Sequence, residues 1–173
     1  WLTLLLAGAA VGSLVWLHQQ RGERTEPTLA AGPRAALALQ SAAATLRHGK
    51  RLILPRVNRP EHRLELYYVT DPEAQLAPGV WDIPEPVVEL CRATELADVE
   101  CVIAPGVGFD IHGGRLGYGG GYYDRLLNSL TPEQARVSVG LCFETQIVRE
   151  VPRGFFDATV SIICTEANLI DNR

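Results

Sequence analysis

Short apolar runs, bounded by polar residues, glycine or proline, recur along most of the chain. A run of four to eight apolar residues predicts a buried strand, and alternation of apolar with smaller residues predicts a strand with one covered face. On this basis we predict strands over 51–55, 63–69, 99–104, 137–143 and 159–164.

Two segments have the residue types of helices. Residues 35–46 are rich in Ala and Leu, and the cations Arg47 and His48 followed by Gly49 form a helix stop signal. A second, shorter helix is expected over about 122–128, and a helical turn or two within 85–96.

Four prolines between 70 and 86 indicate a long loop without regular structure. The alternation of helical segments with short apolar strands favours the α/β class. We therefore expect one domain over 1–173, with a mostly parallel sheet flanked by helices.

The apolar stretch from Trp1 to Leu17 carries no charged residue, and the first cation is Arg21. One interpretation is a buried helix that turns at Gly12 and Ser13 into a buried strand over 14–17. The other is a membrane or export segment, since about 17 apolar residues is the short limit for a membrane span. Residue pattern alone leaves both open.

Composition narrows the class of protein. Of the 173 residues, 16 are Lys or Arg and 20 are Asp or Glu, so the net charge is −4 and a general nucleic-acid binder is disfavoured. The four cysteines are far apart in the sequence, at positions 91, 101, 142 and 164, which disfavours a zinc site. We expect free, mostly buried thiols in a reducing compartment, and hence a cytoplasmic protein.

The segment 104–127 has the strongest chemical signal. Six of the nine positions from Gly113 to Gly121 are glycine, and successive backbone N–H groups in glycine-rich turns can converge on an anion. A helix start directly after the loop would favour a phosphate group further. The spacing fits neither a P-loop nor a dinucleotide-binding fingerprint. A flexible hairpin loop is the alternative.

Several side chains in and near this loop could act on a phosphate group. Arg115 could pair with phosphate oxygens or be an exposed surface cation. Asp124 could hold Mg²⁺ or simply favour the helix start. Asp110 and His112 have the character of turn residues.

The order of these residues resembles the 5-formyltetrahydrofolate cyclo-ligase family, also called 5,10-methenyltetrahydrofolate synthetase. The resemblance covers roughly 14–166 and is most specific in the glycine-rich run. The stretches that carry it are PGVGFD (105–110), GRLGYGGGYYDR (114–125), GKRLILPRV (49–57) and WDIPEP (81–86).

The resemblance implies an enzyme that uses ATP and Mg²⁺ to convert 5-formyltetrahydrofolate to 5,10-methenyltetrahydrofolate, with release of ADP and phosphate. It implies catalytic roles for Arg115 and Tyr122, and folate contacts for Leu17, Glu23, Trp81 and Tyr122. Asp124 and Asp157 would hold Mg²⁺. The residues that would cradle ATP are Arg115, Gly117, Tyr118, Gly119, Gly120, Gly121, Tyr122 and Tyr123.

Two departures from the family pattern leave a second function open. No basic residue precedes Arg21, so the family's basic N-terminal helix is expected to be missing, and Tyr118 stands where the family has an arginine. The alternative is a degenerate or truncated homologue that binds nucleotide or folate without turnover. In either case we expect a monomer that binds a small-molecule substrate, with neither a nucleic-acid nor a membrane partner.

Overall fold

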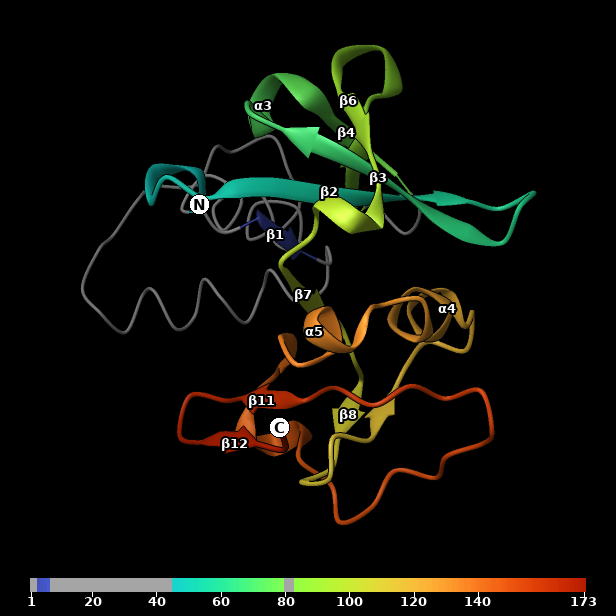
Figure 1. The fold of residues 1–173 in the computed structure, drawn as a ribbon, viewed down its shortest axis with the longest axis vertical. Coiled ribbons are helices and arrows are strands. Elements are labelled where there is room, and N and C mark those ends of the chain that lie inside the picture. Colours follow the sequence, from blue (N-terminus) through green and yellow to red (C-terminus); the bar gives the residue numbers. More distant parts are fainter. Residues whose placement is uncertain (1–2, 7–44, 80–82) are drawn as a thin grey trace.

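An eight-stranded sheet organises the part of the chain that this computed structural model describes, residues 3–6, 45–79 and 83–173 (Figure 1). The strand order is β12-β11-β10-β7-β1-β2-β3-β6. Its strands are β1 (Thr3–Leu6), β2 (Arg51–Asn58), β3 (Arg63–Val69), β6 (Arg92–Thr94), β7 (Cys101–Ala104), β10 (Ser138–Leu141), β11 (Ile162–Cys164) and β12 (Leu169–Asp171).

Smaller elements surround this sheet. Two short hairpins pair β4 (Leu76–Pro78) with β5 (Pro84–Pro86), and β8 (Gly108–Phe109) with β9 (Arg115–Leu116). The helices are α3 (Pro72–Gln75), α4 (Tyr122–Asn128) and α5 (Pro132–Ala135), and the 3₁₀ turns are η2 (Val88–Leu90), η3 (Leu96–Asp98) and η4 (Glu144–Gln146).

The sheet is mixed, so the expected parallel arrangement holds in its centre and not at its edges. The inner strands β11, β10, β7, β1 and β2 are parallel to one another. At the two edges β12, β3 and β6 pair antiparallel. Antiparallel neighbours need only a short turn, as at 59–62 between β2 and β3, whereas parallel neighbours need a long crossover. The α/β class thus holds, with short helices in the described part.

The start of the chain does not form the buried helix of the first interpretation. Thr3–Leu6 is not helical but a strand, β1, which lies between β2 and β7 and is parallel to both. A short apolar run buried in a parallel sheet cannot be told from a buried helix by its periodicity, which explains the error. The strand expected over 14–17 lies outside the described residues. Across 3–6, 45–79 and 83–173, no helix is long and apolar enough to cross a membrane.

One other expectation was wrong. The stretch 70–86 is not free of regular structure, because the Asp71 carboxylate caps α3 by accepting from the N–H groups of Glu73 and Ala74. The β4–β5 hairpin follows it. The helical turn expected within 85–96 is confirmed as the three-residue η2, which leads into β6.

Most other elements agree with the sequence pattern. The bounds of β3 and α4 are those predicted, and β2, β7, β10 and β11 lie in or overlap the predicted runs. The helix before β2 ends as expected, since Gly49 has φ of 68° and donates its N–H to the Leu46 carbonyl at 2.9 Å. The four thiols are free as expected, but only Cys142 is buried, while Cys91, Cys101 and Cys164 are partly exposed. Burial raises the pKa of Cys101 to about 11 and that of Cys142 to about 12.

Both faces of the sheet are covered. Leu52 and Leu54 of β2 pack in one apolar cluster, while Ile53 between them packs in another. The second cluster contains Phe109, which is fully buried under β10. A Cβ atom on Gly140 of β10 would lie 2.4 Å from the Phe109 ring, so this strand must carry glycine at the crossing point.

We expect Gly140→Ala to destabilise the fold by about 1–3 kcal/mol, because the added methyl overpacks the site against Phe109. Urea denaturation measures the change. Combining Gly140→Ala with Phe109→Leu should cost less than the sum of the two single variants, since the smaller side chain makes room. Strictly additive losses would contradict this account of the contact.

Candidate active site

The segment that leaves β7 is held by a buried carboxylate. Asp110 has no exposed surface and accepts three backbone N–H groups, each at 2.9 Å. Those of His112 and Gly114 reach Oδ1, and that of Val151 reaches Oδ2. Asp110 is therefore the turn residue that the sequence indicated, and it also ties the turn to a distant loop.

Arg115 is buried rather than a surface cation. Its side chain is 3% exposed, and its Nη2 donates to Oδ1 of Asp124 at 2.7 Å. Its Nη1 donates to the Pro105 carbonyl at 3.0 Å. The guanidinium thus joins the end of β7 to α4. Its Nε is the one buried side-chain nitrogen or oxygen in the described part of the chain without a hydrogen-bond partner.

The glycine loop itself lies at the surface. Gly119 and Gly121 have φ of 84° and 64°, a region in which other residues are strained. A Cβ atom on Gly117 would lie 3.0 Å from Nη1 of Arg115, whereas one on Gly119 would meet no atom of the described part of the chain within 4 Å. One side of the loop is thus closed by Arg115 and the other is open, and Tyr118 is 66% exposed there.

The two tyrosines that begin α4 point to different surroundings. Burial raises the pKa of Tyr123 well above its usual value, and the Arg115 guanidinium lies 5.9 Å from its ring. The Tyr122 ring is partly exposed and stacks on the His62 ring, with centroids 5.7 Å apart. Because α4 has only seven residues, its dipole is short and adds little to anion binding.

The Asp157 loop is attached to the same helix. The Ala158 N–H donates to Oδ1 of Asp124 at 3.2 Å, and Asn128 donates to the Phe156 carbonyl at 2.9 Å. Asp157 accepts the Gly154 N–H at 2.6 Å and is exposed. The structure therefore brings the segments of the two predicted metal carboxylates side by side.

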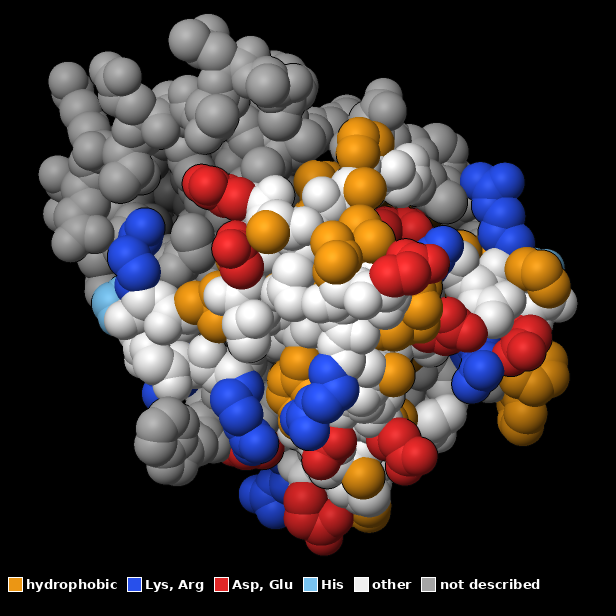
Figure 2. Space-filling view, turned by 90° about the horizontal axis from the view of Figure 1, so that it is seen from above, with side chains coloured by type: hydrophobic (Ala, Val, Ile, Leu, Met, Phe, Trp, Pro, Cys, Tyr) orange, Lys and Arg blue, Asp and Glu red, His pale blue; other side chains and the backbone are white. Residues whose placement is uncertain are grey.

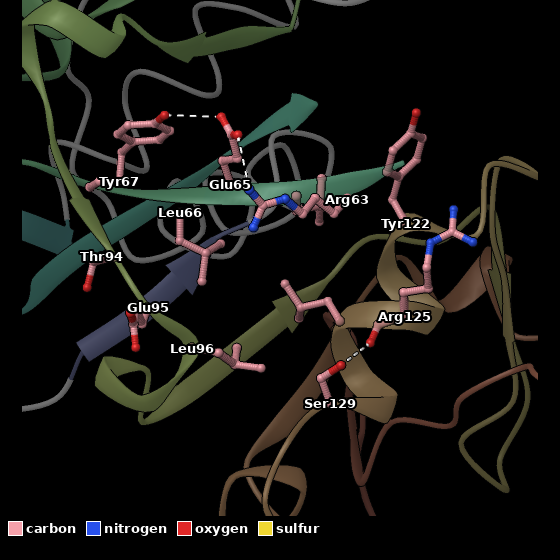
Figure 3. A pocket seen from close by; sticks show the side chains of 13 residues that line it. Arg63, Glu65, Leu66, Tyr67, Thr94, Glu95, Leu96, Tyr122, Arg125 and Ser129 are labelled. Carbon is pink, nitrogen blue, oxygen red and sulfur yellow. Dashed lines mark hydrogen bonds and ion pairs between the residues drawn. The ribbon is translucent and has the colours of Figure 1, made fainter. Parts of the chain in front are cut away.

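A cavity of about 650 Å³ lies between α4 and the β3–β6 edge. Figure 3 shows Tyr122 and Arg125 on the α4 side, while on β3 the Arg63 side chain points along the strand to Glu65, which also contacts Tyr67. Its floor is apolar and includes Leu66, Leu96 and Leu126. This cavity, which shares Tyr122 with the predicted site but is not lined by Arg115, Asp124 or the glycines, is both charged and apolar, as a site for an amphipathic organic substrate requires.

Sequence reasoning found most, but not all, of this arrangement. Arg115, Tyr122, Tyr123, Asp124 and the glycines are together, and Asp157 lies on the adjoining loop. Leu17, Glu23 and Trp81 lie outside the described residues. His62 and Arg125 were missed as neighbours of Tyr122, and no local signal marked His62. On the face in Figure 2, acidic and basic side chains are interspersed.

A match to a family model decides the relationship. The model of the 5-formyltetrahydrofolate cyclo-ligase family matches residues 36–166, about three quarters of the chain. The chain belongs to this family.

Individual cyclo-ligases agree with this assignment. The chain is 31% identical over 136 residues to the probable 5-formyltetrahydrofolate cyclo-ligase of Schizosaccharomyces pombe, covering 73% of the chain and 66% of that protein. It is 29% identical over 123 residues to the cyclo-ligase of Escherichia coli K12, covering 71% and 67%. It thus spans about two thirds of the length of these relatives.

The similarity extends from the sequence to the three-dimensional fold. The 5,10-methenyltetrahydrofolate synthetase of Aquifex aeolicus superposes with a TM-score of 0.67 at 29% identity, over 99% of this chain and 72% of that one. The Mycoplasma pneumoniae synthetase, at 19% identity and a TM-score of 0.51, shares the fold.

We expect Asp124→Ala to destabilise the cyclo-ligase fold by about 3–5 kcal/mol, because it leaves the buried Arg115 cation unpaired. Asp124→Asn should cost less, since its amide oxygen can still accept. Chemical denaturation measures both. Asp171→Ala, which breaks an exposed pair with Arg173, is the control and should change stability little. Equal losses of stability in Asp124→Ala and Asp171→Ala would contradict a stabilising role for the buried Arg115–Asp124 pair.

Asp110 should contribute to acid sensitivity. Burial alone would raise its pKa, but the N–H groups of Val151, Gly114 and His112 outweigh burial and hold it below the ordinary 3.8. The carboxylate therefore stabilises the fold above pH 3.8, and this stabilisation is lost as the pH falls through the lowered pKa. Asp110→Asn should lose about 2 kcal/mol at pH 7 and show a smaller further loss between pH 5 and 3 in acid titrations of unfolding. An unchanged acid profile would contradict this.

Proposed function

We propose that this chain is an ATP- and Mg²⁺-dependent 5-formyltetrahydrofolate cyclo-ligase. It would convert 5-formyltetrahydrofolate to 5,10-methenyltetrahydrofolate and release ADP and phosphate. Family membership supports the reaction. The single structural observation that supports the location of the ATP site is the Nε of buried Arg115, which has no partner among the described residues and lies beside an open glycine loop.

The described residues fit a bound triphosphate. Among the described residues the Arg115 Nε–H has no acceptor, and a phosphate oxygen would supply one. The open side at Gly119 lets a ligand come close to the backbone. In the proposal Arg115 and the loop from Gly117 to Tyr123 hold the triphosphate, and the Tyr122 ring contacts the folate.

Asp124 and Asp157 are the proposed Mg²⁺ ligands. The described residues contain no group of three His, Cys, Asp or Glu side chains placed to bind a metal. A site of two carboxylates suits Mg²⁺, which is usually held by one or two carboxylates together with substrate phosphates and water.

The reaction needs positioning more than covalent chemistry from the protein. A formamide oxygen is a poor leaving group, and bound ATP supplies the phosphoryl group that turns it into a good one. The residues of this chain orient the two substrates and stabilise negative charge at the phosphoryl group, which is the role we assign to Arg115. We further propose that the enzyme acts as a monomer in the cytoplasm.

Non-productive binding is the second candidate, and Tyr118 favours it. An exposed aromatic ring occupies the loop position where the family has an arginine, so the loop carries one cation fewer toward the phosphates. A protein of this kind would bind nucleotide or folate but release neither product.

The assay is methenyl absorbance after mixing the protein with ATP, Mg²⁺ and 5-formyltetrahydrofolate. We expect turnover that depends on both ATP and Mg²⁺, and an increase in kcat/KM of about tenfold in Tyr118→Arg, because a charge-assisted hydrogen bond is restored at a tolerant, exposed position. Tyr118→Gln is the uncharged control and should not gain. ATP binding without product in wild type and Tyr118→Arg would overturn the enzyme and favour the second candidate.

A further inference from the structure

The turn between β2 and β3 carries a residue in an unusual backbone conformation. His62 has φ of 52°, and among the described residues it is the one non-glycine with positive φ. Such a conformation is uncommon for a residue with a Cβ atom, although histidine tolerates it better than most. A glycine would adopt it at lower cost but would bring no side chain to this position.

Arg125 of α4 links this turn to the glycine loop. Its Nε donates to the His62 carbonyl at 2.8 Å, and its Nη2 donates to the Gly120 carbonyl at 3.0 Å. The same Nη2 lies 3.2 Å from Nδ1 of His62. One guanidinium therefore fixes two segments that are far apart in the sequence, the β2–β3 turn and the proposed triphosphate loop.

The His62 ring also fixes Tyr122. The two rings are stacked with an interplanar angle of 9° and centroids 5.7 Å apart. The Arg125 guanidinium lies 5.7 Å from the Tyr122 ring centroid. We call His62, Tyr122 and Arg125 the turn–helix cluster; it lies where Tyr122 and Arg125 form one wall of the cavity (Figure 3).

We propose that His62 is a positioning residue for substrate binding, acting through Tyr122 and, by way of Arg125, through Gly120. The inference rests on the proposed function, in which Tyr122 contacts folate and the loop holds ATP. His62 touches neither substrate in this proposal. It sets the ring plane of Tyr122 and the path of the loop before the substrates arrive, which lowers the ordering cost of binding.

His62→Gly separates positioning from folding. Glycine keeps the carbonyl that accepts from Arg125 and relieves the positive φ, so the melting temperature should stay the same or rise. The variant removes the ring and Nδ1. We expect KM for 5-formyltetrahydrofolate and the Kd for MgATP, measured by calorimetry, each to rise about tenfold, with kcat within about twofold of wild type.

Two variants serve as controls. Asn adopts positive φ readily and offers an amide oxygen to Arg125, so His62→Asn should recover part of the MgATP affinity but less of the folate KM, which depends on the stack. His48→Asn changes an exposed histidine at the opposite end of β2 and should leave both constants unchanged. Wild-type constants in His62→Gly would overturn the proposal.

The binding measurements test the cluster independently of turnover. Absence of turnover in wild type, together with weaker MgATP binding by His62→Gly, would overturn the proposed reaction and support the positioning role. Unchanged MgATP binding by His62→Gly would overturn the positioning role whether or not the wild type turns over.

Discussion

The buried Arg115–Asp124 pair is the interaction on which the site depends. The guanidinium is surrounded by protein and reaches the carbonyl after β7 on one side and α4 on the other. Because a buried cation without a partner is costly, the helix must begin where its Asp124 can meet Arg115. The loop between them then passes close to the guanidinium, and a Cβ atom at position 117 would lie 3.0 Å from its Nη1, so a small residue is favoured there.

Asp124 consequently has two roles in the proposed enzyme. Its Oδ1 already accepts from Arg115 and from the Ala158 backbone, and the latter contact holds the segment that carries Asp157. The proposed metal site and the scaffold therefore share a carboxylate. A substitution there changes folding and chemistry at the same time, so activity loss alone would not reveal which role failed.

The sequence was informative where local chemistry decides structure. The helix over 122–128, the strand over 63–69 and the glycine loop followed from residue type and spacing. It was less informative where distant partners decide. The run at 3–6 is a strand because two parallel neighbours pair with its backbone, and Arg115 is buried where Asp124 and Pro105 meet it. The contact of His62 with Arg125 joins residues that only the folded sheet brings together, so no local pattern could predict it.

The position of β1 affects the order in which the sheet can form during synthesis. This strand is made before both of its partners, and Leu6 pairs with Ile103 of β7. At about 5–20 residues per second, the ribosome needs roughly 5–20 s to deliver that partner. During this interval an apolar strand has one neighbour at most, and such an unpaired edge invites aggregation. Nascent chains of this protein should therefore be clients of chaperones that bind early apolar segments.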